Sequence, residues 1–175
     1  MKAKGSNTRR LTAAATLAAL GVLTLVIGSV LDVLSLSAAA FAAMPLYIAL
    51  RELGYRRATL VYAVTALLAL VLFPQSDAVL SYALLLGLYT LIKFPIERLS
   101  RRAALPVKLL FLNVAFTGIE LIGIFLFSLP PFEWWFYAIV YLAANAAFLL
   151  YDRVLDRLIV LYEARLRARI AHFFE

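Results

Sequence analysis

Two apolar stretches in the second half of the chain carry polar side chains whose spacing places them on helical faces. The first stretch holds, at spacings of four and three, Asn113, Thr117 and Glu120. The second holds, at spacings of four, Tyr137, Tyr141 and Asn145. Residues three or four apart share one side of an α-helix. Amides, phenols and carboxylates are also the groups that orient a ligand in a mainly apolar pocket. The pattern predicts two polar faces that meet at similar depth.

Glu120 is the acidic residue that most needs an explanation. It lies about twelve residues past Lys108, which at about 1.5 Å per residue places it near or just beyond the middle of a membrane. A charge at that depth costs about 2.5–3.5 kcal/mol, so it should face a bundle interior or a watery cavity. We expect an outward-opening small-molecule or ion site with Glu120 as charge or proton carrier. The alternative is a protonated Glu120 that only bonds Asn145 between helices.

Further polar residues complete the expected site. Asn145, Thr117 and Tyr141 are the expected hydrogen-bond partners of a ligand, and two tyrosines of a preceding apolar run are candidates to line the same cavity. The candidate substrate-binding residues are therefore Glu120, Asn145, Thr117, Asn113, Tyr141, Tyr82 and Tyr89.

Motifs of the common enzyme classes are absent from the sequence. It has no Gly-rich phosphate loop, no His-Glu-x-x-His, no Gly-x-Ser-x-Gly and no pair of carboxylates within one apolar run. The absence of cysteine excludes disulfides, cysteine-based zinc sites and iron–sulfur clusters. We therefore expect neither catalysis nor a metal nor a cofactor, and the chain lacks an ATPase of its own.

The composition sets the kind of element that must position these residues. Hydrophobic residues make up 65% of the 175 and charged residues 15%, against about 45–50% and 25% in soluble domains. A membrane-spanning helix needs about 20 mainly apolar residues. The sequence therefore predicts an all-α membrane protein, a single domain over 1–175, whose six spans are 11–31, 33–50, 58–73, 78–92, 107–127 and 134–151.

The charged residues predict the orientation of these spans. All 17 Lys and Arg residues fall in the two terminal segments or around the connections after the second and fourth spans. The three other connections carry only Asp32, Asp77 and Glu133. Because positive residues stay on the cytoplasmic side, both termini should be cytoplasmic in a bacterial inner membrane. The +7 net charge then reports topology, so we expect no nucleic-acid partner. The first run, 11–31, is too long for a signal peptide and should be retained.

The first span carries a stripe of small residues. At spacings of four, three and seven it presents Ala14, Ala18, Gly21 and Gly28. Such residues let helix backbones approach closely in lipid. The stripe is predicted to dock either on another helix of the same chain or on a different subunit.

Features at the two membrane boundaries have simpler interpretations. Lys93 should reach from the inner end of the fourth span to the lipid headgroups, with a substrate or coupling role as the alternative. Trp134 and Trp135 are typical of an outer aromatic belt. In segment 152–174 the apolar residues recur at spacings of three and four, and the basic residues largely avoid the helical face that they form. This pattern predicts an amphipathic helix that lies on the anionic leaflet or docks on a partner.

Six short helices with Ala14-x-x-x-Ala18 in the first resemble the substrate-binding S components of energy-coupling factor (ECF) transporters. The chain is also similar to small six-helix membrane proteins of bacteria, and the residues that carry this similarity are Ala18-Ala19-Leu20-Gly21, Gly87-Leu88-Tyr89 with Lys93 and Glu97, Asn145-Ala146-Ala147-Phe148 and Tyr151-Asp152.

The S-component resemblance implies specific roles. Ala14 and Ala18 would contact a membrane-embedded coupling subunit, and the implied substrate ligands near the outer side are Glu120, Tyr141 and Asn145. The first outer connection departs from that family, because it shrinks to about Asp32 where S components use a longer lid loop.

These observations lead to three functional hypotheses. The leading one is an S-component-like subunit that binds the substrate of a bacterial micronutrient or vitamin importer. Its partners would be the bilayer, a coupling subunit and separate ATPases. The second is a non-transporting membrane scaffold or assembly protein that uses the small-residue stripe to bind a partner. The third is a small proton-coupled carrier centred on Glu120.

Overall fold

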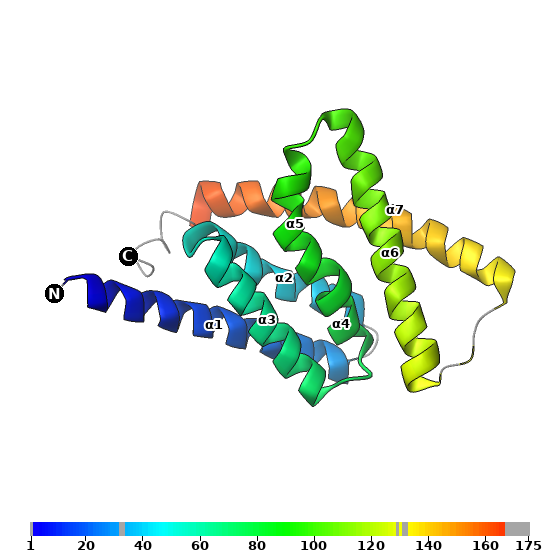
Figure 1. The fold of residues 1–175 in the computed structure, drawn as a ribbon, viewed down its shortest axis with the longest axis horizontal. Coiled ribbons are helices and arrows are strands. Elements are labelled where there is room, and N and C mark those ends of the chain that lie inside the picture. The colour runs from blue at the N-terminus through cyan, green and yellow to red at the C-terminus, as the bar shows by residue number, and fades with distance from the viewer. Residues whose placement is uncertain (1, 32–33, 129, 131–132, 167–175) are drawn as a thin grey trace.

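The computed structural model describes residues 2–31, 34–128, 130 and 133–166. Throughout these residues every regular element is a helix, as the composition predicts (Figure 1). The elements are α1 (Lys2–Val30), α2 (Ser35–Glu52), α3 (Tyr55–Leu72), α4 (Asp77–Leu80), the π-helical turn η2 (Ser81–Leu86), α5 (Gly87–Glu97), α6 (Arg101–Phe127), α7 (Trp134–Leu161) and a second π-helical turn η3 (Tyr162–Leu166).

Five helical segments are long and apolar enough to cross a membrane, so the chain is a multi-pass membrane protein. These segments are Asn7–Val30, Tyr55–Leu72, Asp77–Glu97, Arg102–Phe127 and Trp134–Arg165. The third joins α4, η2 and α5 into one continuous helix, in which the N–H of Gly87 donates to the carbonyl of Tyr82, five residues earlier. Such π-type insertions often mark functional sites.

The helix outside this group, α2, lies at the centre of the bundle. Its alanines Ala39 and Ala43 are fully buried, as are the larger Leu46 and Tyr47. Helices α1 and α3 pack on α2, and so does the segment α4–η2–α5. Small side chains allow this close approach. The small residues of α2 are therefore concentrated on its buried face, whereas Leu36 and Phe41 on the other side are exposed.

The small-residue stripe of α1 packs inside the chain. Ala18, Gly21 and Gly28 are buried, and Ala14 is half-buried against the core. A Cβ atom added to Gly28 would lie 2.2 Å from the Cβ atom of Ala38 in α2. One added to Gly21 would lie 2.9 Å from the Cγ2 atom of Thr65 in α3. Of the two docking partners that the sequence left open, the structure therefore shows helices of the same chain.

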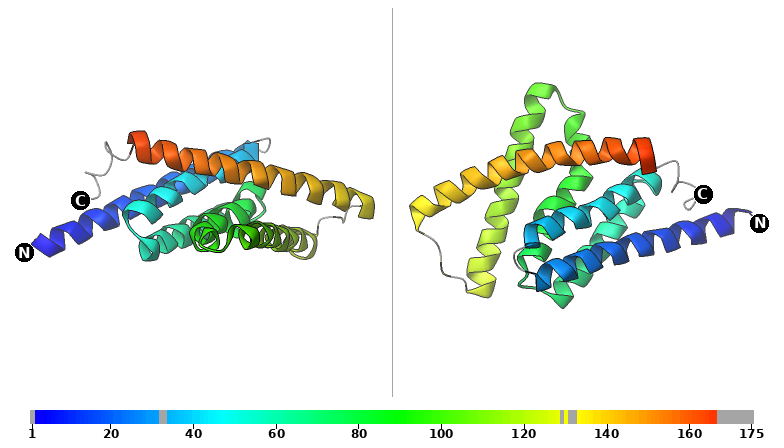
Figure 2. Two further views of the ribbon diagram at one scale, coloured as in Figure 1. Left: turned by 90° about the horizontal axis from the view of Figure 1, so that it is seen from above. Right: turned by 180° about the vertical axis from the view of Figure 1, so that it is seen from behind.

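Helices α6 and α7 form the other side of the molecule and cross each other at a steep angle (Figures 1 and 2). Helix α7 continues without a break past Tyr151, where the last span was expected to end. Leu155 and Tyr162, from the apolar face expected to lie on the leaflet, are buried in the protein. The Tyr162 hydroxyl donates to Glu52 at 3.3 Å. Residues 167–174 of the expected amphipathic segment lie outside the described residues.

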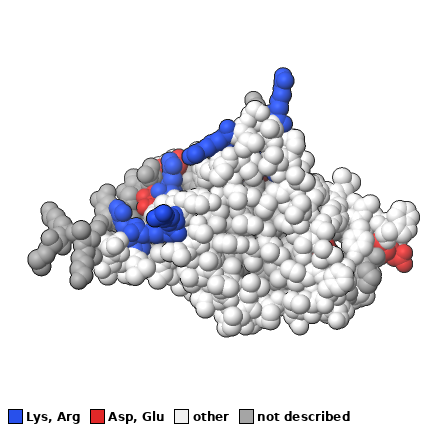
Figure 3. Space-filling model, in the orientation of Figure 1, with Lys and Arg blue, Asp and Glu red and all other residues white. Residues whose placement is uncertain are grey.

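Lys and Arg side chains gather at one end of the molecule, and the opposite end carries acidic residues. Lys and Arg residues gather along the left and upper edges in Figure 3, where α1 begins and where the α2–α3 and α5–α6 connections lie. At the opposite end, α4 begins with Asp77, and Glu133 precedes α7. Asp32, the third acid expected there, lies outside the described residues.

Candidate functional site

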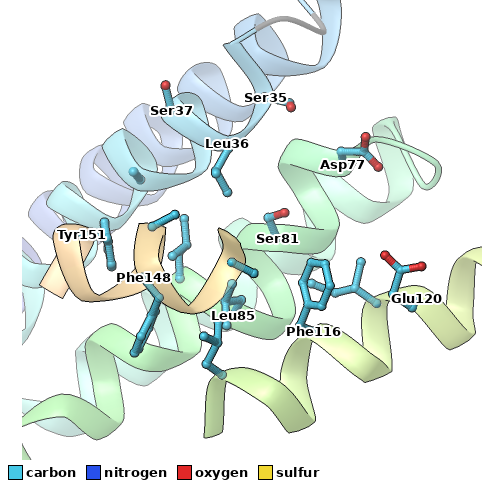
Figure 4. Close-up of a pocket in the computed structure, with 16 residues that line it drawn as sticks. Ser35, Leu36, Ser37, Asp77, Ser81, Leu85, Phe116, Glu120, Phe148 and Tyr151 are labelled. Atoms are coloured by element: carbon cyan, nitrogen blue, oxygen red, sulfur yellow. The ribbon is translucent and has the colours of Figure 1, made fainter. Parts of the chain in front are cut away.

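A cavity of about 460 Å³ lies between α2, η2, α6 and α7 (Figure 4). Its walls are mainly apolar and include Leu85, Phe116 and Phe148. The π-helical turn contributes Ser81, whose hydroxyl is directed into the space. The polar side chains that line the cavity come from Ser35, Ser37, Asp77, Ser81, Glu120 and Tyr151.

A second cavity, of about 290 Å³, lies next to the first, toward the C-terminal end of α6. Its lining includes Gln75 and Phe127, and it shares Asp77, Ile119 and Glu120 with the larger cavity. The two carboxylates therefore belong to the walls of both cavities, one from α4 and one from α6, and Figure 4 shows both on the same side of the larger cavity. We refer to Asp77 and Glu120 as the acidic mouth.

The carboxylates of the acidic mouth have no hydrogen bond or salt bridge with any residue that the structure describes. The described salt bridges involve other acids, at the end of the molecule that carries the cations. Glu120 is half-buried and Asp77 is exposed. When both are ionised, these carboxylates, with apolar walls behind them, create a negative potential at this side of the cavity.

The other polar residues of α6 and α7 bond to one another. Asn113 and Asn145 exchange two side-chain hydrogen bonds of 3.1 Å, and the hydroxyls of Thr117 and Tyr141 lie 2.7 Å apart. The two polar faces therefore meet at the same depth. None of these four residues lines the cavity, and Glu120 does not bond to Asn145.

The two candidate tyrosines lie away from the cavity. Tyr82 is buried in the core, with its ring centroid 6.0 Å from that of Tyr62. Tyr89 is also buried, and its hydroxyl donates to Asp152 at 2.5 Å. Of the seven candidate substrate-binding residues, the structure thus places only Glu120 at the cavity wall.

A partly buried group of charges, which the sequence pattern did not predict, joins α5, α6 and α7 at the end of the molecule that carries the cations. Lys93 is only 1% exposed and forms ion pairs with Glu97 at 2.9 Å, Asp156 at 2.8 Å and Asp152. Lys108 pairs with Asp152 at 2.7 Å and with Glu97 at 3.1 Å. We call these five residues the inner charge cluster. Its three carboxylates approach one another within 4.8 Å, and Lys93 neutralises part of their charge.

The inner charge cluster corrects the prediction that Lys93 reaches the headgroups. Removing one partner of a buried ion pair typically costs 3–5 kcal/mol, because the other charge is left uncompensated. The cluster therefore fixes the relative position of three helices. The sequence did contain a signal for this cluster. Lys93, Lys108 and Asp152 stand at those ends of three different apolar runs that are predicted to lie on the same side of the membrane, and the two lysines carry the charge opposite to that of the aspartate.

An aromatic layer separates the cavity from the inner charge cluster. The Tyr89 ring lies 4.7 Å from that of Phe148, 6.0 Å from Phe111 and 6.4 Å from Tyr151, measured between centroids. The Tyr151 hydroxyl is buried and has no hydrogen-bond partner among the described residues. From its N-terminal to its C-terminal end, α7 thus borders a cavity, an aromatic layer and a group of ion pairs.

No family model matches the chain, and neither a curated protein nor a solved structure does. The resemblance to S components consequently remains a prediction from the sequence.

Proposed function

We propose that this chain binds a small molecule in the cavity between α2, η2, α6 and α7. The cavity is the observation that carries the proposal. At about 460 Å³ it falls within the 300–1,000 Å³ that is typical of small-molecule sites. Its mainly apolar wall with a few polar groups also fits such a site. The outer cavity that meets it at Glu120 supplies a path of entry.

The proposal includes an orientation in a bacterial cytoplasmic membrane. The five apolar helical segments and the buried α2 together make six spans, with both termini in the cytoplasm. The separation of charge supports this orientation, because Lys and Arg are retained on the cytoplasmic side. The acidic mouth then lies toward the outside, where a binding subunit of an importer would meet its substrate.

We further propose that the protein is the substrate-binding subunit of a micronutrient importer, with separate coupling and ATPase subunits. Gly21 and Gly28 are closed by α3 and α2, so the coupling contact belongs on another surface. Purification after mild solubilisation tests this part of the proposal. Recovery of an ATPase and a coupling subunit with the chain supports it, and a stable complex with only biosynthetic or division proteins contradicts it.

Mass spectrometry of small molecules that co-purify with the chain tests binding itself. Ala144→Phe places a large side chain in the cavity wall, whereas Ala143 is exposed and lies outside the cavity. We expect a bound small molecule in the wild type and in Ala143→Phe, and its loss in Ala144→Phe. Ala147→Phe, with Ala146→Phe as its control, repeats the test at a second wall position. Equal recovery from all five proteins contradicts the proposal.

A further inference from the structure

We infer that the ligand of this cavity is an amphipathic organic cation, an ammonium-type group on an apolar body. The inference rests on the proposed function, namely that the cavity binds a small molecule, and adds the chemical class of that molecule. Three independent observations lead to it: the unpaired acidic mouth, the distribution of cations and the nature of the cavity wall.

The acidic mouth lacks a counterion within the described part of the chain. Asp77 and Glu120 line both cavities, and neither takes part in a described salt bridge. An ionised carboxylate at Glu120 is costly to hold in a membrane unless a partner or water compensates it. A ligand cation between the two carboxylates would supply that partner, which makes its binding strongly favourable.

Cations of the protein itself lie far from the mouth. No described Lys or Arg residue lines either cavity. On the face that Figure 3 shows, Lys and Arg residues gather at the other end of the molecule, and Lys93 and Lys108 are engaged by the inner charge cluster. A carboxylate or phosphate ligand would therefore meet two acids and no basic side chain. Repulsion between like charges selects against such anions.

The remainder of the cavity fits the apolar part of the ligand. Phe116 and Phe148 present aromatic rings, and Leu85 adds an aliphatic surface. Aromatic faces attract organic cations, especially quaternary ammonium groups, when water is excluded. Tyr151 lines the same cavity and adds a third aromatic residue to its wall. A small inorganic ion would leave this apolar surface unused.

The test is equilibrium dialysis of phenyltrimethylammonium against the full chain in lipid nanodiscs, with empty nanodiscs as the blank. Benzenesulfonate provides an anion of similar size, and tert-butylbenzene a neutral molecule of nearly identical shape. We expect saturable binding of phenyltrimethylammonium that weakens by about tenfold or more in Glu120→Gln and in Asp77→Asn. Glu133→Gln, an exposed acid at the same end of the molecule and outside both cavities, should leave binding unchanged.

The remaining outcomes distinguish a failure of the cation assignment alone from a failure of the proposed function. No binding of phenyltrimethylammonium, no effect of either carboxylate variant, or tighter binding of benzenesulfonate overturns the cation assignment. The cavity proposal then still stands if any molecule, a probe or a co-purified compound, is lost on Ala144→Phe and kept on Ala143→Phe. If no molecule shows that difference, both the cation assignment and the cavity proposal fail.

Discussion

Lys93 illustrates how far a single residue can be interpreted from the sequence. A lysine at the end of an apolar run is usually expected to reach the headgroups, and nothing in its neighbourhood along the chain contradicts that. Besides Glu97, four residues on, its ion-pair partners include Asp152, which is 59 residues away. Only the packing of α5 against α7 brings the two together, so the ion pair depends on tertiary structure that periodicity does not encode.

Replacing Lys93 should strongly destabilise the protein. Lys93→Met leaves three neighbouring carboxylates with less compensation, and we expect a loss of about 3–5 kcal/mol in the free energy of unfolding. Asp156 is 53% exposed, so Asp156→Asn should cost less than about 1 kcal/mol. Reversible unfolding in detergent micelles measures both. A loss of less than about 1 kcal/mol for Lys93→Met would mean that the cluster does not hold the helices together.

The Asn113–Asn145 pair should contribute a modest coupling between α6 and α7. Asn113→Leu, Asn145→Leu and the double variant form a double-mutant cycle, and the expected coupling energy is about 0.6–2 kcal/mol, as for other hydrogen bonds between membrane helices. The same unfolding measurement gives the value. A coupling near zero would contradict the reciprocal hydrogen bonds seen in the structure.

At the scale of the elements, hydropathy predicted where helices form better than where they end. The run expected at 78–92 lies within the continuous segment Asp77–Glu97, and the run expected at 134–151 extends as α7 to Leu161. Both continue because the residues beyond the apolar run are held by other helices: Glu97 through Lys108, and Leu155 within the core. Composition alone does not report such contacts.

The packing of α1 on α2 can be tested by replacing Gly28, with a second glycine, Gly118, as the control position. Gly28→Leu would bring its side chain into Ala38, 2.2 Å from the added Cβ atom, and should cost several kcal/mol because both backbones would have to separate. A Cβ atom added to Gly118, inside α6, would have no atom of another helix within 4 Å. Gly118→Ala should therefore be neutral or stabilising by up to about 1 kcal/mol. Thermal stability in nanodiscs compares them. A tolerated Gly28→Leu would contradict the packing of α1 on α2.

At the scale of the whole molecule, the sequence predicted the charge asymmetry but not the surroundings of Glu120. Helical spacing grouped Glu120 with Asn113 and Thr117, although those residues bond to α7 and leave Glu120 facing a cavity. Its neighbour across the mouth, Asp77, was interpreted only as a loop residue. Spacing within one helix identifies a face, and the tertiary fold decides which residue of another helix stands opposite.

The orientation in the membrane can be tested directly because the chain has no native cysteine. Single cysteines at Gln75 and Glu133 should react with a membrane-impermeant maleimide added to intact cells. Cysteines at Arg57 and Arg98 should react only after the membrane is opened, since they lie among the cations at the inner end. Labelling of Arg57→Cys or Arg98→Cys in intact cells would invert the proposed orientation.

The central claim, an outward-opening cavity with a negative mouth, is tested most directly by the reactivity of Ser81→Cys, whose side chain faces that cavity (Figure 4). Cationic and anionic methanethiosulfonates are added from outside, and each rate is divided by the rate of the same reagent with a free thiol. We predict that the cationic reagent is favoured by about tenfold or more. The preference should shrink when Glu120→Gln is added. An unreactive cysteine, or equal normalised rates for the two reagents, would contradict the account.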